Sequence, residues 1–235
     1  MKKILLLVLT ALLSTTIYAN NCSTFYDQNN FAKAFSACKA EAEQGEMESQ
    51  FLLAYMYQYG EGVEENNQRA LYWYTKAAKQ GDGKSRNNLG LMYSEGNGVK
   101  VDKEKAVYWW TQAAEQGIDA SQYQLGVMYA KGEGVKEDKE KALYWWTKAA
   151  EQGIHYAQYN LGIMYFWGDG IKKNKEKALY WWTKAAEQGF DYAQYEIGMM
   201  YKNGDGVKKN KVLAKKYFMQ ACSHGLISAC ERIIP

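Results

Sequence analysis

The sequence repeats itself every 36 residues, and this period constrains the fold more than any other feature. Glycine, alanine and an asparagine-or-aspartate position each recur at this spacing six times. The glycine column consists of Gly45, Gly81, Gly117, Gly153, Gly189 and Gly225. Residues 20–235 span six such periods. A fixed period of this length is typical of solenoids and related arrays, in which each unit buries its apolar face against its neighbours.

Each unit is predicted to form two helices, and the fourth unit shows the pattern most clearly. Apolar residues fall at helical spacing over residues 156–165 and again over 175–188. Asn174 stands just before the second segment, where its side chain can cap backbone N–H groups. Gly189 follows that segment, and glycine ends helices because it adopts the left-handed conformation at low cost. The sequence therefore predicts an all-α fold built from helix-turn-helix repeats.

Four units carry a glycine in the middle of the first predicted helix: Gly90, Gly126, Gly162 and Gly198. A mid-helix glycine costs about 1 kcal/mol relative to alanine, so the position needs a compensating reason. Close approach of a bulky neighbour is the simplest one. We expect that neighbour to be a tryptophan of the second helix.

The repeated residues resemble a known family. The pattern Ala-x-x-x-Leu-Gly-x-x-Tyr-x-x-Gly-x-Gly-Val, followed by Asx-x-x-x-Ala-x-x-Trp-aromatic-x-x-Ala-Ala-x-x-Gly, is similar to the Sel1-like repeat (SLR), a relative of the tetratricopeptide repeat. The resemblance covers about residues 30–235. It implies a right-handed alpha–alpha superhelix, or solenoid, that binds other proteins and is usually not catalytic.

The first 19 residues have the pattern of a secretory signal peptide. Lys2 and Lys3 precede an apolar run at 4–13, and Ala19 is a suitable last residue before cleavage. The alternative is an uncleaved amphipathic N-terminus. The residues before Cys22 do not suit a lipoprotein cleavage site, and no later stretch is long enough for a membrane span. We expect the protein in a bacterial periplasm, with secretion as the alternative.

The repeat pattern divides the rest of the chain. Both ends match only part of a unit and are predicted to be caps, since an end repeat has a neighbour on one side only. The expected segments are an N-terminal cap and half repeat at 20–45, five SLR repeats at 46–82, 83–118, 119–154, 155–190 and 191–226, and a C-terminal cap helix at 227–235.

The four cysteines lie in the two caps, and exported proteins commonly hold disulfides. Four cysteines allow three pairings. Because a solenoid keeps its ends apart, we expect Cys22 to pair with Cys38, and Cys222 with Cys230. The seven-residue gap between Cys222 and Cys230 is similar to the cysteine spacing in cysteine-rich secreted SLR proteins. Four free thiols are the alternative.

Composition and motifs point away from catalysis. The chain has 29 Lys and Arg against 26 Asp and Glu, whereas nucleic-acid binding needs a more basic footprint. Neither His155 nor His224 has a partner at a catalytic spacing, and no CxxC motif is present. We therefore expect no enzyme activity, no cofactor and no metal. A beta-lactamase-like enzyme is a lesser alternative.

One face of the first helices changes from unit to unit, while the packing positions stay the same. At 100° per residue this face holds Tyr156, Ile163 and Trp167 in the fourth unit. The resemblance implies that first helices line the concave side, so these positions are expected to form a partner-binding groove. The groove residues are Leu52, Tyr55, Tyr59, Leu91, Glu95, Val127, Lys131, Tyr156, Ile163, Trp167, Tyr192 and Met199.

Trp167 is the most distinctive groove residue, because aromatic side chains often anchor protein interfaces. Its alternative role is packing over its own loop. A regular column on the second helices, Tyr72, Tyr108, Tyr144 and Tyr180, is expected to face outward as a structural ladder.

The sequence thus predicts an exported, monomeric scaffold that binds a protein partner and acts as a periplasmic adaptor or regulator. An immunity protein that neutralises a secreted antibacterial toxin, such as a phospholipase effector, is the main alternative. A secreted factor that acts on a host is a lesser one. The partner itself is not encoded in any motif.

Overall fold

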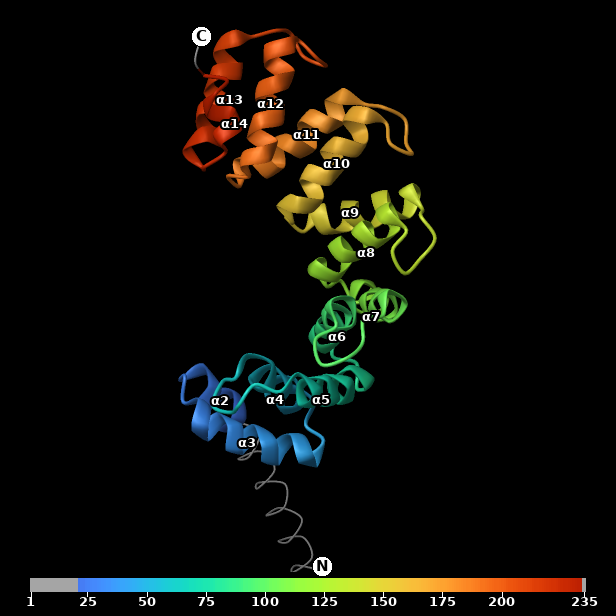
Figure 1. Ribbon diagram of the computed structural model, residues 1–235, viewed down its shortest axis with the longest axis vertical. Helices are drawn as coiled ribbons and strands as arrows, with labels where there is room; N and C mark the ends of the chain where they lie inside the picture. The colour runs from blue at the N-terminus through green and yellow to red at the C-terminus, as the bar shows by residue number, and fades with distance from the viewer. Residues whose placement is uncertain (1–20, 234–235) are drawn as a thin grey trace, which may run out of the picture. The chain divides into compact units, whose positions relative to one another are not determined.

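The computed structural model describes residues 21–233, and every regular element in that range is an α-helix (Figure 1). The expected signal peptide at 1–19 lies outside the described residues. The helices are α2 (Asn21–Asp27), α3 (Phe31–Gln44), α4 (Met47–Tyr59), α5 (Asn67–Lys79), α6 (Gly83–Glu95), α7 (Lys103–Glu115), α8 (Asp119–Lys131), α9 (Lys139–Glu151), α10 (His155–Trp167), α11 (Lys175–Glu187), α12 (Asp191–Asn203), α13 (Lys211–Ser223) and α14 (Ile227–Cys230). None of these helices is both long and apolar enough to cross a membrane.

Helices pair in the way that the 36-residue period predicts. The pairs are α4 with α5, α6 with α7, α8 with α9, α10 with α11, and α12 with α13. A second helix also packs on the first helix of the following repeat, as α5 does on α6 and α11 does on α12. Each pair therefore buries apolar surface that it could not bury alone. The expectation of an all-helical solenoid of helix pairs is confirmed.

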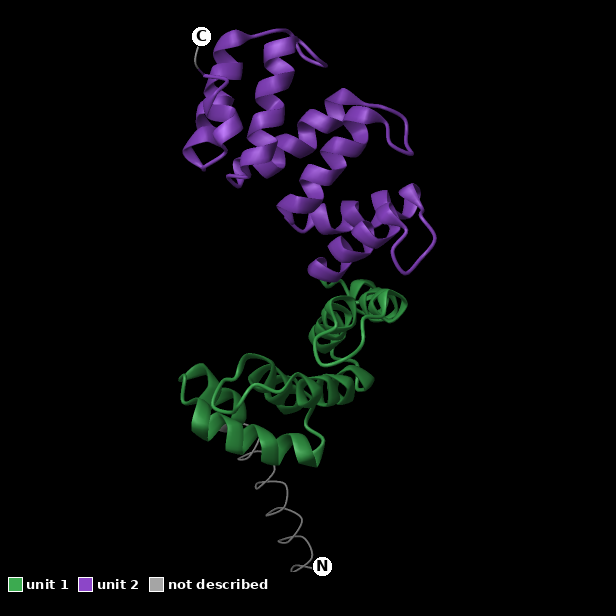
Figure 2. Ribbon diagram, in the orientation of Figure 1, with its two compact units in different colours: residues 1–118 green, residues 119–235 purple. Residues whose placement is uncertain are grey.

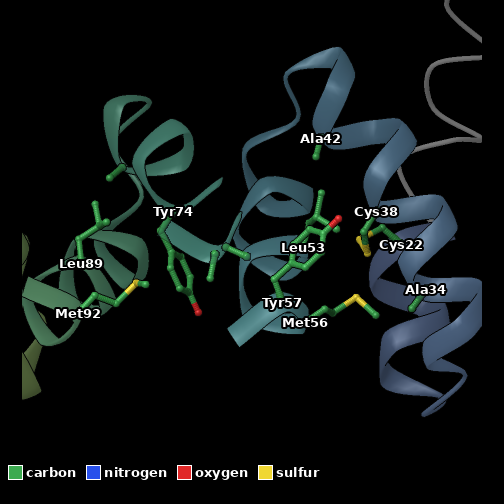
Figure 3. Packing of buried hydrophobic residues seen from close by; sticks show 13 residues of the cluster. Cys22, Ala34, Cys38, Ala42, Leu53, Met56, Tyr57, Tyr74, Leu89 and Met92 are labelled. Atoms are coloured by element: carbon green, nitrogen blue, oxygen red, sulfur yellow. A yellow bond between two sulfur atoms is a disulfide. The ribbon is translucent and has the colours of Figure 1, made fainter. Parts of the chain in front are cut away.

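The chain divides into two compact units, with the boundary after Ile118 (Figure 2). In the first unit one cluster of buried side chains runs from Cys38 on α3 through Leu53 and Tyr74 to Leu89 on α6 (Figure 3). In the second unit buried residues of each second helix pack against the next first helix. Trp182 and Ile197 belong to one such cluster.

Side chains of the asparagine-or-aspartate column cap five of the second helices. The capping residues are Asn66, Asp102, Asp138, Asn174 and Asn210, and each accepts a backbone N–H bond from the first turn. Asn30 stands first in the same column, so it too was expected to cap a helix, but its side chain makes no cap bond. Its backbone has φ −88° and ψ 66°, away from the extended conformation of the others, because the chain turns sharply out of α2.

The N-terminal cap contains a helix that the repeat pattern did not predict. Helix α2 packs on α3, and a disulfide joins Cys22 to Cys38 (Figure 3). The Glu41 carboxylate is buried between these helices and α4. It accepts the Cys22 backbone N–H at 3.3 Å and the Ser49 hydroxyl at 2.5 Å. At the other end α14 is held by a Cys222–Cys230 disulfide. Both pairings are the expected ones.

The mid-helix glycines lie where a large ring touches the first helix, as expected. The rings are those of Trp110 at Gly90, Trp146 at Gly126, Trp182 at Gly162 and Phe218 at Gly198. A Cβ at any of these glycines would overlap the ring. Close packing of the two helices therefore offsets the helix-propensity cost of glycine.

We expect Gly162→Ala to destabilise the protein by about 2 kcal/mol, even though alanine favours the helix by about 1 kcal/mol. The added methyl group would collide with the buried Trp182 ring. Gly198→Ala should cost less, because its Cβ would stand 2.7 Å from Cε1 of the smaller Phe218 ring, farther than the Trp182 ring stands from position 162. Urea unfolding followed by far-UV circular dichroism measures both. An unchanged midpoint for Gly162→Ala would contradict the packing argument.

Candidate binding face

All twelve expected groove residues lie on first helices, and we call them together the first-helix face. In the first unit they are Leu52, Tyr55 and Tyr59 on α4, with Leu91 and Glu95 on α6. In the second unit they are Val127 and Lys131 on α8, Tyr156, Ile163 and Trp167 on α10, and Tyr192 and Met199 on α12. Each unit thus carries its own part of this face.

The largest aromatic side chains of the first-helix face are half or more exposed. The exposed fractions are 57% for Tyr59, 50% for Tyr156, 69% for Trp167 and 51% for Tyr192. Glu95 and Lys131 are also exposed, while the aliphatic members and Tyr55 are partly buried. Aromatic rings left in water are candidates for burial against a partner.

Trp167 ends α10 and points most of its indole into solvent. Its ring contact is an edge-on one with Phe166 at 5.0 Å, and Phe166 in turn lies 5.3 Å from the core ring of Trp182. Glycine follows at position 168 with φ 76°, so the helix stops directly after the tryptophan. The high exposure does not support a packing role over its own loop.

In the first unit the exposed Tyr59 belongs to a larger aromatic group. The rings of Tyr55 and Tyr59 lie 4.4 Å apart, and Tyr26 on α2 lies 6.3 Å from Tyr55. The Tyr26 hydroxyl donates a hydrogen bond of 2.7 Å to Glu61. Burial, and then this carboxylate, raise the pKa of Tyr26. The sequence did not point to Tyr26, because it lies on the unpredicted helix α2.

In the second unit four aromatic rings surround Phe190, the residue before α12. Phe190 lies 5.0 Å from His155, 5.3 Å from both Tyr156 and Tyr159, and 5.8 Å from Tyr192. Tyr123 on α8 extends the group, at 6.0 Å from Tyr156. Only Tyr156 and Tyr192 were expected here. The missed signal is that Phe190 occupies a position held by Ile118 and Ile154 in earlier repeats.

A carboxylate stands beside this aromatic group. Glu196 lies one helical turn after Tyr192, and burial raises the pKa of its carboxyl. Burial and then the Glu196 charge raise the pKa of Tyr159 to about 12. The two side chains are therefore close enough to interact electrostatically.

The second-helix tyrosines show that exposure alone does not define a binding face. Tyr72, Tyr108, Tyr144 and Tyr180 are 53–58% exposed, and each packs edge-on against the tryptophan that follows it at about 5 Å. Lysine ammonium groups lie over three of these rings. The edge-on contact recurs in the first four repeats, as expected for a structural ladder, whereas the fifth repeat has Lys216 at this position. The first-helix face differs because its residues change between repeats.

The residues described here hold no group of three or more histidine, cysteine or acidic side chains that could bind a metal ion. The sequence contains one Ser-x-x-Lys motif, from Ser36 to Lys39 on α3, which sequence reasoning missed. The Ser36 hydroxyl is exposed and donates to the Ala32 carbonyl at 3.3 Å, one turn earlier in the same helix. This is the ordinary back-bond of a helical serine.

Comparison with known proteins identifies the repeats. A family model described as the Sel1 repeat matches residues 48–82, 83–118, 119–154, 155–190 and 191–226. The chain belongs to the Sel1 repeat family. Proteins built from Sel1 repeats are generally protein-interaction scaffolds. The matched segments contain every residue of the first-helix face.

Solved structures of Sel1 repeat proteins share this fold. A protective antigen with an SLR fold from uropathogenic Escherichia coli has 35% identity and a TM-score of 0.88, over 95% of this chain and 50% of that one, so this chain spans about half its length. A Sel1 repeat protein from Oxalobacter formigenes has 30% identity and a TM-score of 0.82, over 90% of this chain and 84% of that one. An immunity protein from Pseudomonas aeruginosa, with 22% identity and a TM-score of 0.50 over 86% and 81%, shares the fold alone. A search of curated proteins found no match.

Proposed function

We propose that this Sel1 repeat protein is exported and binds a partner protein through its first-helix face, as an adaptor or regulator in a bacterial periplasm. The observation that carries the proposal is the exposed Trp167, which stands where other repeats have Tyr59, Glu95, Lys131 and Asn203. A fold that tolerates five different side chains at one position does not need tryptophan there. An exposed indole is, however, among the strongest anchors of protein interfaces.

The cysteines support the exported part of the proposal. All four are in disulfides, and such bonds persist in oxidising compartments such as the periplasm. The signal-like pattern of residues 1–19 agrees with this compartment. Cell fractionation of the full-length protein, with and without residues 1–19, tests it. Retention in the cytoplasm of the full-length chain would contradict export.

Trp167→Ala is expected to weaken partner binding at least tenfold, because interface anchors contribute about 2 kcal/mol or more. The melting temperature should change little, since the indole is mostly in solvent. The measurement is affinity capture from envelope extract with the exported chain as bait. The captured protein is then titrated against the parent chain and against Trp167→Ala. The activity of the captured protein, measured with and without this chain, separates an adaptor from an inhibitor.

Tyr180→Ala is the matched control, because it removes an aromatic residue of similar exposure from a second helix of the same unit. It should leave capture unchanged. If Trp167→Ala and Tyr180→Ala weaken capture equally, or if neither does, the first-helix face is not the binding surface.

A further inference from the structure

Glu196 is the one charged residue in a column of partly buried positions. The equivalent residues in the earlier repeats are Leu52, Asn88, Gln124 and Asn160, all uncharged and all partly buried. An apolar or amide side chain therefore satisfies the fold at this position. A carboxylate costs free energy there, because partial burial removes part of its hydration.

Within residues 21–233 the Glu196 carboxylate has no hydrogen-bond or ion-pair partner, and burial alone accounts for its raised pKa. An amide in the same column does find a partner. The Asn88 side-chain oxygen accepts a hydrogen bond of 3.3 Å from the Asn87 amide. Glu196 affects Tyr159 only through its charge. A half-buried anion is thus left without a compensating group.

Two tyrosines, Tyr192 and Tyr159, lie near this anion. Tyr192 stands one turn before Glu196 on α12 and is half exposed. The Tyr159 ring lies 6.1 Å from the Tyr192 ring and 5.3 Å from that of Phe190. Ring faces attract cations, most strongly where water is displaced. A carboxylate beside two tyrosines therefore creates a negative potential that attracts a cation, within the first-helix face.

We infer that Glu196, Tyr159 and Tyr192 receive an arginine side chain of the partner protein. A guanidinium is planar, stacks on aromatic faces and donates two parallel hydrogen bonds to a carboxylate. It would supply the positive charge and the donors that Glu196 lacks. This inference rests on the proposed function, since it assigns the chemistry of one contact on the same face.

The test is an NMR titration of the exported chain with the blocked peptide acetyl-Gly-Arg-Gly-amide. We expect saturable shifts at Tyr159, Tyr192 and Glu196. The neutral isostere, with citrulline in place of arginine, should bind about tenfold more weakly or worse, because it lacks the charge. Equal shifts with both peptides, no shifts, or tighter binding of choline than of the arginine peptide would overturn the inference.

Glu196→Gln provides the matching variant. Glutamine is accepted at the equivalent Gln124, so the variant should fold, and its melting temperature should equal or exceed that of the parent chain. Its affinity for the arginine peptide should fall at least tenfold. Glu187→Gln, which removes an exposed carboxylate from α11 of the same unit, should keep the parent affinity. Equal losses in both variants would contradict a specific site.

The two proposals fail in different ways. If the arginine peptide does not bind but Trp167→Ala still weakens capture, the first-helix face remains the binding surface and the arginine site is wrong. If the arginine peptide binds Glu196 while Trp167→Ala leaves capture unchanged, the local site stands and the proposed function is wrong.

Discussion

Trp182→Ala is expected to lower the free energy of unfolding by about 4 kcal/mol, the usual range for removing a buried tryptophan. The Trp182 ring is almost completely buried, lies against Gly162 and packs 5.3 Å from Phe166. Its indole N–H also donates to the Tyr159 carbonyl at 3.1 Å. Because glycine has no side chain that can move into the space, the cavity should stay open. Urea unfolding followed by far-UV circular dichroism measures the loss.

Trp181→Ala is the control for Trp182→Ala. Trp181 is the neighbouring residue, only partly buried, and its ring lies 5.0 Å from the exposed Tyr180. Its removal should cost about 1–2 kcal/mol, in proportion to the smaller apolar area that it buries. Equal losses in the two variants would show that burial against Gly162 does not set the stability.

A sharper result is expected when Gly162→Ala is added to Trp182→Ala. In the parent chain the new methyl group collides with the indole, so Gly162→Ala destabilises. With the indole gone, the methyl group fills part of the cavity and alanine favours the helix by about 1 kcal/mol, so the same substitution should stabilise. A change that destabilises in both backgrounds would mean that glycine is needed there for another reason.

This glycine–tryptophan contact could be predicted from the sequence because both residues recur in several repeats at the same spacing. Gly90, Gly126 and Gly162 recur at the same distance before Trp110, Trp146 and Trp182. One repeat alone would leave the glycine ambiguous between a packing position and a helix end. The repetition of both residues shows that they form one contact, and the same logic predicted the helix pairs and the five side-chain caps.

Features that occur once in the chain were not predictable in this way. Helix α2 has seven residues and does not match the pattern of the repeats, so the 36-residue period did not predict this helix. The period did not predict the buried Glu41 either. Asn30 looks like the other capping residues in sequence, yet α2 before it changes its backbone conformation.

The binding face shows a second limit of sequence reasoning. Projection along one helix found Tyr156 and Tyr192. It missed Phe190, which precedes a helix, and Tyr159, which lies beside the projected stripe. These rings join the face only through packing between α10 and α12, which no single-helix projection describes. Glu196 falls on the projected stripe between Tyr192 and Met199, but it was not among the expected groove residues, although its charge in an otherwise uncharged column was visible in the sequence.

The N-terminal cap should depend on its disulfide more than on any other single bond. Replacing Cys22 and Cys38 together by alanine is expected to cost about 3 kcal/mol, the value of the chain-entropy model for a loop of this size. The two residues are 16 apart, and both are fully buried in the core of the first unit. A pairwise replacement leaves no free thiol, so the loss reports the crosslink and the packing of its sulfur atoms.

Amide hydrogen exchange locates this loss, because stability in a repeat protein is largely a sum over neighbouring contacts. We expect faster exchange in α2 and α3 and little change in α12. The matched control replaces Cys222 and Cys230, which are 8 residues apart and only partly buried. Its shorter loop should cost about 0.6 kcal/mol less, and the faster exchange should appear in α13 and α14 instead. Equal exchange across all helices in either variant would contradict caps that act locally. A local effect would instead mean that each disulfide closes one exposed end of the solenoid, where a terminal helix has only one neighbour to hold it.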